Sequence, residues 1–193
     1  EILYDIIQAI PASLSREAAE NIYTAILTDT GSFRFANTTA RALEIAAEMV
    51  ALGVTPDKIA SEVYDSMSPE RLRLLARSLH TLTLRANGRL ATMQVSQRML
   101  EETKTTVMDT DGFVNYPRGL STAEMAIFFR EMDSGKVNVS LRSRGKLNVA
   151  EFARSYDGGG HHNAAAFRAE GSLPEVVEKI LAAAEEFIAG GAQ

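Results

Sequence analysis

Residues 158–166 read Gly-Gly-Gly-His-His-Asn-Ala-Ala-Ala, and this stretch guides the interpretation of the whole chain. Consecutive glycines give the backbone unusual conformational freedom and let its N–H groups approach an anion closely. A histidine directly after them can donate a hydrogen bond to a phosphate oxygen. A plain glycine turn is the simpler interpretation. The following His161, His162 and Asn163 favour an anion-binding loop formed by Gly158, Gly159 and Gly160, with His161 as the better candidate of the two histidines.

Regular elements flank this loop on both sides. Residues 136–142 alternate strictly, with Val137, Val139 and Leu141 facing one way, which predicts a strand. A helical period covers residues 147–156, residues 157–160 form the glycine loop, and residues 164–169 predict a last strand. Ser172 and Glu175 have the spacing of a capping box, for a helix that reaches about Ala189.

The same mixture extends upstream to about residue 88. Residues 89–96 predict a strand, residues 98–104 a short helix, and residues 110–112 a turn. Residues 121–132 predict an amphipathic helix, whose apolar side carries Met125, Ala126, Phe128 and Phe129. Because strands and helices interleave, residues 88–193 predict a small α/β domain with a mixed sheet.

The first part of the chain contains helical patterns only. Its opening residues already repeat at helical spacing without a cap, and Pro11 ends this helix, so we expect a piece of a longer protein. Ser15 is a plausible cap for the next helix, which ends near Gly31. Thr38 or Thr39 caps the one after it, for which we expect these inward-facing residues: Leu43, Ala46, Ala47 and Val50.

Two prolines at first helical positions, in Thr55-Pro56 and Ser68-Pro69, begin a pair of helices reaching about Leu84. The second helix shows no apolar core beyond its own stripe, so residues 55–87 are interpreted as a helical connector between domains. His80 lies on this connector without an obvious partner, and we interpret it as structural.

Composition and charge restrict the function. The 193 residues are 46% hydrophobic and 23% charged, which is typical of a globular protein, and no run approaches the roughly 18 apolar residues of a membrane span. Zero cysteines exclude disulfides and thiolate metal sites, and fit the cytoplasm. A net charge of −5 argues against a protein that coats nucleic acid. One basic segment stands out against a single acid, Glu151: Lys136, Arg142, Arg144, Lys146 and Arg154. One basic segment on an acidic protein indicates a small anionic ligand more than a long polyanion.

The segment Thr28-Asp29-Thr30-Gly31-Ser32 is a candidate metal-binding turn. A carboxylate at a helix end, followed by glycine and hydroxyl residues, can bind a hard divalent cation, although a simple helix stop is equally compatible. One carboxylate cannot hold Mg²⁺ or Mn²⁺ firmly, and the three histidines of the chain form no cluster in sequence. If Asp29 is a ligand, its co-ligands are missing from this sequence.

Two further polar segments are candidates for binding an anion. Arg142 ends the alternating strand, where a guanidinium can grip phosphate through two hydrogen bonds, and Ser143 adds a hydroxyl. Asn115 and Arg118 form a second polar loop, in the segment Val114 to Gly119. A charged strand end or a polar loop is common without any such function.

In their order, these motifs resemble the DHH phosphoesterases, and among them the RecJ-like nanoRNase/pAp-phosphatase subgroup. The motifs are Asp29-Thr30-Gly31-Ser32-Phe33-Arg34-Phe35 with Asn37-Thr38-Thr39, then Arg142-Ser143, then Gly158-Gly159-Gly160-His161. The resemblance covers nearly all 193 residues. It implies the tail of a DHH catalytic domain in residues 1–54, the connector in residues 55–87, and a DHH-associated substrate-binding domain in residues 88–193.

The resemblance also implies roles for individual residues. Asp29 would be the last ligand of a site for two Mn²⁺ ions, while Arg142, Ser143, His161 and the glycines would hold the phosphate and nucleotide of the substrate. The Asp-His-His motif of the family is absent, so we expect that the chain begins after it and is inactive alone.

The expected activity is hydrolysis of short oligonucleotides or 3′-phosphoadenosine 5′-phosphate by the full-length protein. A cyclic-dinucleotide or polyphosphate hydrolase of the same family stays open, as does a nucleotide-binding module without catalysis. Alanyl-tRNA-synthetase-like proteins carry a related domain, but they lack the Asp29 segment, so this class is the least favoured. No membrane partner is expected, and the sequence leaves a homodimer open.

Overall fold

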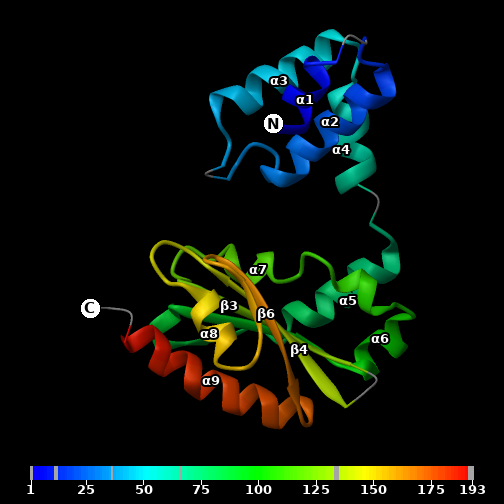
Figure 1. Ribbon diagram of the computed structural model, residues 1–193. Helices are drawn as coiled ribbons and strands as arrows, with labels where there is room; N and C mark the ends of the chain where they lie inside the picture. Colours follow the sequence, from blue (N-terminus) through cyan, green and yellow to red (C-terminus); the bar gives the residue numbers. More distant parts are fainter. Residues whose placement is uncertain (1, 11–12, 36, 66, 133–134, 191–193) are drawn as a thin grey trace. The chain divides into compact units, whose positions relative to one another are not determined.

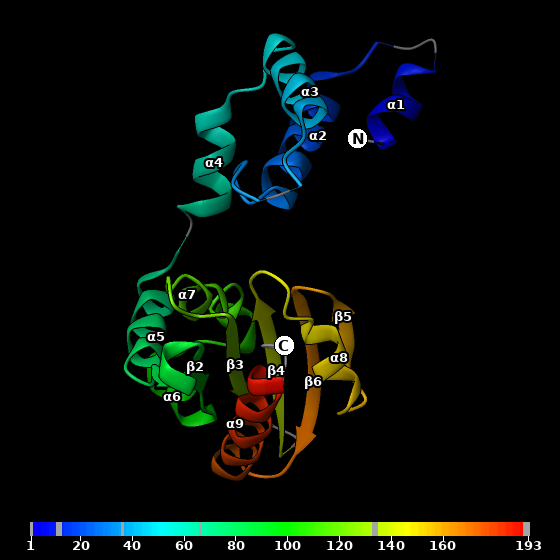
Figure 2. The same cartoon turned by 90° about the vertical axis from the view of Figure 1, so that its left-hand side faces the viewer.

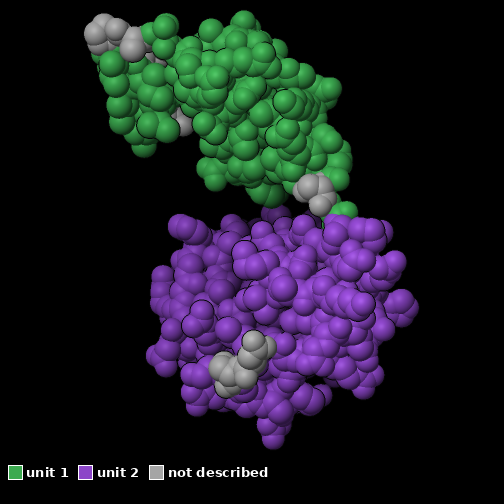
Figure 3. Space-filling model, turned by 90° about the vertical axis from the view of Figure 1, so that its right-hand side faces the viewer, with its two compact units in different colours: residues 1–67 green, residues 68–193 purple. Residues whose placement is uncertain are grey.

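The computed structural model describes residues 2–10, 13–35, 37–65, 67–132 and 135–190. Contacts divide the chain into two compact units, residues 1–67 and residues 68–193 (Figure 3). This boundary falls inside the 55–87 segment that we interpret as a connector. Among the helices of these described ranges, none combines the length and the hydropathy needed to cross a membrane.

The first unit is helical, as predicted (Figure 1). It comprises α1 (Ile2–Gln8), α2 (Arg16–Asp29), α3 (Ala40–Ala51) and α4 (Pro56–Tyr64). Two predicted caps are confirmed: the Ser15 hydroxyl accepts from the Ala18 N–H at 3.3 Å, and Thr39 accepts from the Ala42 N–H at 2.9 Å. The predicted helix stop at Pro11 lies outside the described residues.

The buried face of α3 differs from the prediction. The helix buries Ala42, Ile45, Ala46 and Met49, whereas Leu43 is 49% exposed and Val50 is 41% exposed. Both stripes have the same i, i+3, i+4, i+7 spacing, so the sequence pattern cannot choose between them. Packing against α2 selects the stripe that lies one residue earlier in the sequence.

Within the described residues, six strands of the second unit form one sheet in the order β1-β2-β3-β4-β6-β5 (Figure 2). The strands are β1 (Thr83–Arg85), β2 (Leu90–Val95), β3 (Met125–Glu131), β4 (Lys136–Ser143), β5 (Gly159–His161) and β6 (Ala164–Glu170). The pair β2 and β3 is parallel, and the other neighbours are antiparallel. The predicted mixed sheet is therefore confirmed.

Three local predictions for this unit are wrong. The helix that begins at Pro69 ends at Leu79 and does not reach Leu84, which lies in the strand β1. Residues 121–132 contain the strand β3 and not a helix, and Gly159–His161 form the strand β5 within the predicted glycine loop. Met125 to Phe129 are all buried, because β3 lies inside the sheet between β2 and β4 and is covered on both faces. A short apolar run of this kind does not distinguish a buried strand from a helix.

Helices cover the two faces of the sheet unequally. On one face, α8 (Val149–Arg154) and α9 (Leu173–Gly190) enclose Val137, Val139 and Leu141 in the main core (Figure 2). On the other face, α5 (Pro69–Leu79), α6 (Gln97–Thr103) and the segment before α7 (Asn115–Arg118) pack over β2 and β3. Two short 3₁₀ turns, Ala86–Gly88 and Val107–Thr110, complete the unit.

The helix α5 belongs to the second unit by its packing. Leu74 and Leu75 are buried in a cluster with Met93, Phe113 and Phe128, although we expected no apolar core for this helix beyond its stripe. His80 follows α5, and its Nδ1 lies 2.7 Å from the Ala76 carbonyl, which fits a structural role.

The predicted start of the last helix is confirmed. The Glu175 carboxylate accepts from the Ser172 N–H at 3.1 Å and from the Ser172 hydroxyl at 2.6 Å. These contacts lower the pKa of Glu175, with the hydroxyl as the larger cause. They fix the turn that leads from β6 into α9.

Candidate functional site

One face of the sheet is open where β4, β6 and β5 lie side by side. Side chains of an antiparallel pair that are directly opposite point to the same face, so the register defines which residues share it. We call the following residues, which point away from α8 and α9, the open face: Asn138, Ser140, Arg142, Gly159, His161, Ala164, Ala166 and Arg168. The members on β4 are half-buried, whereas Gly159, His161, Ala166 and Arg168 are exposed.

The register brings Arg142 and His161 into one row. Arg142 on β4 is paired with Ala164 on β6, and His161 on β5 is paired with the same Ala164 from the other side. The two Cα atoms are therefore about 10 Å apart, which is two strand spacings. Because Ala164 between them is small, a guanidinium and an imidazole flank a shallow space on the same face.

The guanidinium of Arg142 is partly shielded from water. Burial lowers the pKa of its guanidinium, and the nearby charge of Arg118 lowers it further, while Asp111 acts in the opposite direction. An arginine nevertheless stays protonated at neutral pH. One hydrogen bond, from Nη1 to the Leu141 carbonyl at 2.9 Å, orients the group. A half-buried guanidinium beside a second one is well suited to bind an anion.

The three glycines of the loop have different roles. A Cβ on Gly158 would lie 2.4 Å from the Ala166 carbonyl oxygen and 2.4 Å from the Phe167 Cβ. A Cβ on Gly160 would lie 2.4 Å from the Ala164 carbonyl oxygen. A Cβ on Gly159 would meet nothing within 4 Å. Gly158 and Gly160 are thus required by the close approach of β5 to β6, while Gly159 leaves the open face flat.

Ser143 does not share the open face with Arg142. Adjacent residues of a strand point to opposite faces, and Ser143, only 2% exposed, points toward the main core. Its hydroxyl donates to the Leu147 carbonyl at 2.7 Å and accepts from Asn163 Nδ2 at 3.0 Å. Ser143 therefore ties the turn after β4 to the turn after β5, and the sequence prediction of an Arg142-Ser143 pair on one ligand needs this correction.

We expect Ser143→Ala to lower the free energy of unfolding by about 1–3 kcal/mol, because the buried hydroxyl is lost and both the Leu147 carbonyl and the Asn163 amide lose a hydrogen bond. Urea unfolding followed by circular dichroism measures the change. The control is Ser121→Ala at an exposed serine, for which the expected change is within about 0.5 kcal/mol. Equal stability of the two variants would contradict the tying role of Ser143.

Comparison with known proteins shows the family to which this chain belongs. The sequence profile of the DHHA1 domain matches residues 87–190. This chain belongs to the DHHA1 domain family. It is 35% identical over 190 residues to the bifunctional oligoribonuclease and PAP phosphatase NrnA of Thermus thermophilus, which covers 96% of this chain and 56% of that protein. The NrnA of Bacillus subtilis is 30% identical over 148 residues, covering 77% of this chain and 46% of that protein.

A solved structure supports the same relationship. The exopolyphosphatase-related protein from Bacteroides fragilis superposes with a TM-score of 0.83 at 31% identity, over 89% of this chain and 50% of that protein. The chain thus spans about half the length of the curated relatives that it matches. The DHHA1 profile covers the whole sheet from β2 onward, and with it the open face.

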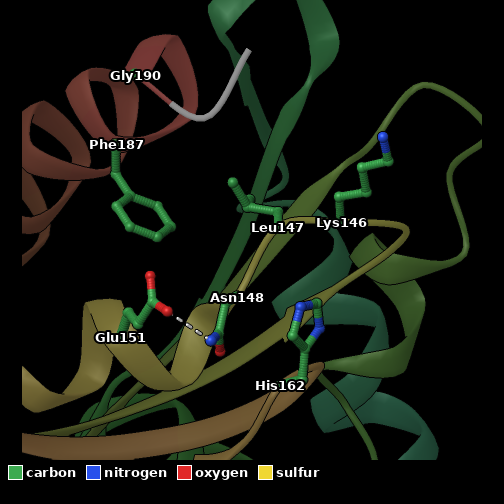
Figure 4. Close-up of a pocket in the computed structure, with 7 residues that line it drawn as sticks. All are labelled: Lys146, Leu147, Asn148, Glu151, His162, Phe187 and Gly190. Carbon is green, nitrogen blue, oxygen red and sulfur yellow. Dashed lines mark hydrogen bonds between the residues drawn. The ribbon is translucent and has the colours of Figure 1, made fainter. Parts of the chain in front are cut away.

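His162 lies apart from the open face of the DHHA1 domain. His162 lines a separate hollow, whose volume is about 460 Å³. Figure 4 shows its imidazole among the other residues that line this hollow. The other lining residues are Lys146, Leu147, Asn148, Glu151, Phe187 and Gly190. The His162 carbonyl accepts from the Val149 N–H at 2.9 Å, which anchors the turn at the start of α8. The structure therefore separates the two histidines and places His161, the preferred candidate, with Arg142.

Arg118 and Asn115 sit on α7 of the DHHA1 domain. Arg118 is half-buried at the end of α7, close enough for its charge to act on Arg142. The Asn115 side chain is exposed at the start of the same helix. Of the predicted polar loop, the structure thus brings Arg118 to Arg142, while Asn115 has no described contact with the open face.

The basic segment from residue 134 to residue 154 is not one patch in space; Ser134 itself lies outside the described residues. Lys146 lines the separate hollow, and Arg154 is exposed on α8, on the opposite side of the sheet from Arg142. Instead, Arg168 lies on the open face of the DHHA1 domain, and Arg118 and Arg130 lie next to residues of that face. The sequence analysis does not identify Arg130, because it predicts a helix where β3 lies. It does not identify Arg168, because the pairing of Arg168 with Asn138 depends on strand register.

Asp29 lies in the first unit, outside the DHHA1 match. It is exposed at the last position of α2, and its carbonyl accepts from Asn37 Nδ2 at 3.1 Å. The following Gly31, Ser32 and Phe33 all have left-handed backbone angles, with φ of 56°, 60° and 61°. Two non-glycine residues in this region indicate a strained turn, which is a frequent feature of functional sites.

The residues described here do not fit a two-metal site by themselves. Within the described ranges, no three His, Asp or Glu side chains gather in a way that could hold a metal ion. Asp29 is one candidate ligand, and one carboxylate is too few for a pair of Mn²⁺ ions. A metal role for Asp29 depends on ligands from elsewhere in the protein.

Proposed function

We propose that this chain is the substrate-binding portion of a DHH-family phosphoesterase that hydrolyses short oligonucleotides or 3′-phosphoadenosine 5′-phosphate. The observation that carries the proposal is the row Arg142–Ala164–His161 on the open face, next to Arg118. The names of the NrnA relatives, which describe oligoribonuclease and PAP phosphatase activities, support the choice of substrate.

Each residue of this row has a separate role in binding a nucleotide. Arg142 presents two parallel N–H donors to a phosphate, which gives geometric specificity as well as affinity. His161 donates a further hydrogen bond from the neighbouring strand. Gly159, Ala164 and Ala166 leave room above the sheet for a base or a ribose, since none of them has a side chain beyond Cβ. Together they position the phosphate ester for attack, which can lower a barrier by several kcal/mol.

We also propose Mn²⁺ as the cofactor of the whole protein, with Asp29 as the ligand that this chain contributes. A pair of such ions would activate the attacking water and stabilise the leaving oxygen. The strained turn after Asp29 supports this role. A cytoplasmic location, which the absence of cysteine fits, and a homodimer are further proposals for the whole protein.

The test combines binding and turnover by the 193-residue chain. We expect it to bind 3′-phosphoadenosine 5′-phosphate and a labelled dinucleotide, and to hydrolyse neither of them with Mn²⁺ present. Turnover by this chain alone would show that the catalytic ligands lie within these residues. Tighter binding of a cyclic dinucleotide or of polyphosphate would replace the proposed substrate class.

A further inference from the structure

A second polar row crosses the open face, four residues from Arg142 along β4. Arg130 on β3 and Arg168 on β6 are both paired with Asn138, so all three side chains point to the same face. The row lies about 14 Å from the Arg142 row, at about 3.4 Å per residue. Between the two rows lie Ser140 and Ala166, both with short side chains.

Arg130 is held in place by the turn that precedes α7. Its Nη1 donates to the Val107 carbonyl and to the Thr110 hydroxyl, both at 3.0 Å. Burial lowers the pKa of its guanidinium, the charge of Arg168 lowers it further, and Asp111 opposes both effects. Arg130 is therefore a fixed, half-buried cation, and the exposed Arg168 lies on the same face, on the other side of Asn138.

Among the residues that the structure describes, no carboxylate forms an ion pair with either arginine of this row, Arg130 or Arg168. Glu170, two residues beyond Arg168 on the same face, is already bound to Lys136 at 3.0 Å. The charge of the single carboxylate Asp111 acts on both Arg130 and Arg142. The row keeps a positive charge on a protein whose net charge is −5.

We propose that Arg130, Asn138 and Arg168 form a second phosphate subsite, which holds a distant phosphate of an oligonucleotide whose terminal phosphate is bound at Arg142. The inference rests on the proposed function and specifies its substrate class. The two phosphates of 3′-phosphoadenosine 5′-phosphate are carried by one ribose, so they cannot span the two rows. The subsite therefore distinguishes oligonucleotides of several residues from a mononucleotide.

The decisive variant is Arg168→Ala, because Arg168 is exposed and has no described hydrogen bond, so that its loss leaves the fold intact. The measurements are dissociation constants for 3′-phosphoadenosine 5′-phosphate, a dinucleotide and a pentanucleotide, each at several salt concentrations. We expect binding of the pentanucleotide to weaken about tenfold, with its salt slope reduced by about 0.7, and binding of the mononucleotide to stay unchanged. Arg154→Ala, which removes the same charge from α8, is the matched control.

The binding results distinguish the second phosphate subsite from the proposed function. Equal weakening for all three ligands would overturn the subsite, because Arg168 would then contribute only a general field. Unchanged binding of the pentanucleotide would overturn it as well, while the proposed function stood. If the unaltered chain bound none of the three ligands, the proposed function would fall, and the subsite with it. Partial recovery of pentanucleotide affinity in Arg168→Lys would support a contact through charge.

Discussion

Arg142→Ala is expected to weaken binding of 3′-phosphoadenosine 5′-phosphate about 100-fold, equivalent to about 2.7 kcal/mol. A charge-assisted hydrogen bond contributes about 1.5–3 kcal/mol, and Arg142 offers two of them to one phosphate. Its guanidinium is already half-buried beside Arg118, so an anion gains a partly desolvated cation. Titration calorimetry with the 193-residue chain measures the loss directly.

Two further variants make this result specific. Arg142→Lys keeps the charge but loses the two-pronged geometry, so we expect an intermediate loss of about tenfold. Arg154→Ala removes an exposed arginine from the opposite side of the sheet, and should bind like the unaltered chain. A similar loss in Arg142→Ala and Arg154→Ala would mean that overall charge, and not the row on β4, binds the ligand. Unfolding curves of all three variants identify any loss that comes from misfolding.

Gly158→Ala is expected to lower the free energy of unfolding of the second unit by about 3 kcal/mol. The added Cβ would overlap the Ala166 carbonyl oxygen and the Phe167 Cβ, both at 2.4 Å, and a backbone atom cannot rotate away. Phe167 is itself confined, because its ring stacks on Tyr156 with centroids 4.6 Å apart. Urea unfolding followed by circular dichroism measures the loss of stability.

The neighbouring Gly159→Ala is the matched control, with the same chemical change one residue away. Its Cβ meets nothing within 4 Å, so its stability should change by no more than about 1 kcal/mol. Its ligand affinity should nevertheless fall, because the new methyl group stands on the open face beside Ala166. Equal destabilisation of the two variants would contradict the assignment of separate roles to the glycines.

Features that depend on neighbours in sequence were predictable. Ser15 is predicted to begin one helix and Thr38 or Thr39 the next, and the structure shows caps at Ser15 and Thr39, because capping involves residues only three positions apart. The strand β4 was evident from its alternation, which reflects one buried and one open face. The order of Asp29, Arg142 and the glycine loop indicated the family before any contact was known.

Some errors also had a signal in the sequence. The alternation that correctly predicts β4 already places the side chains of Arg142 and Ser143 on opposite faces of the sheet. By contrast, Met125 to Phe129 carry no period that separates a buried strand from a helix. The two stripes of α3 are equivalent until α2 packs against one of them.

By itself, the sequence determined the class of fold, the ends of several helices and the candidates Arg142 and His161, because each depends on local spacing and residue chemistry. Only the tertiary structure decided which charges share a surface. Arg142 and His161 lie on the same face because both are paired with Ala164. Arg130 and Arg168 lie on the same face because both are paired with Asn138. The order and register of those strands follow from the packing of the whole sheet, which no local pattern contains.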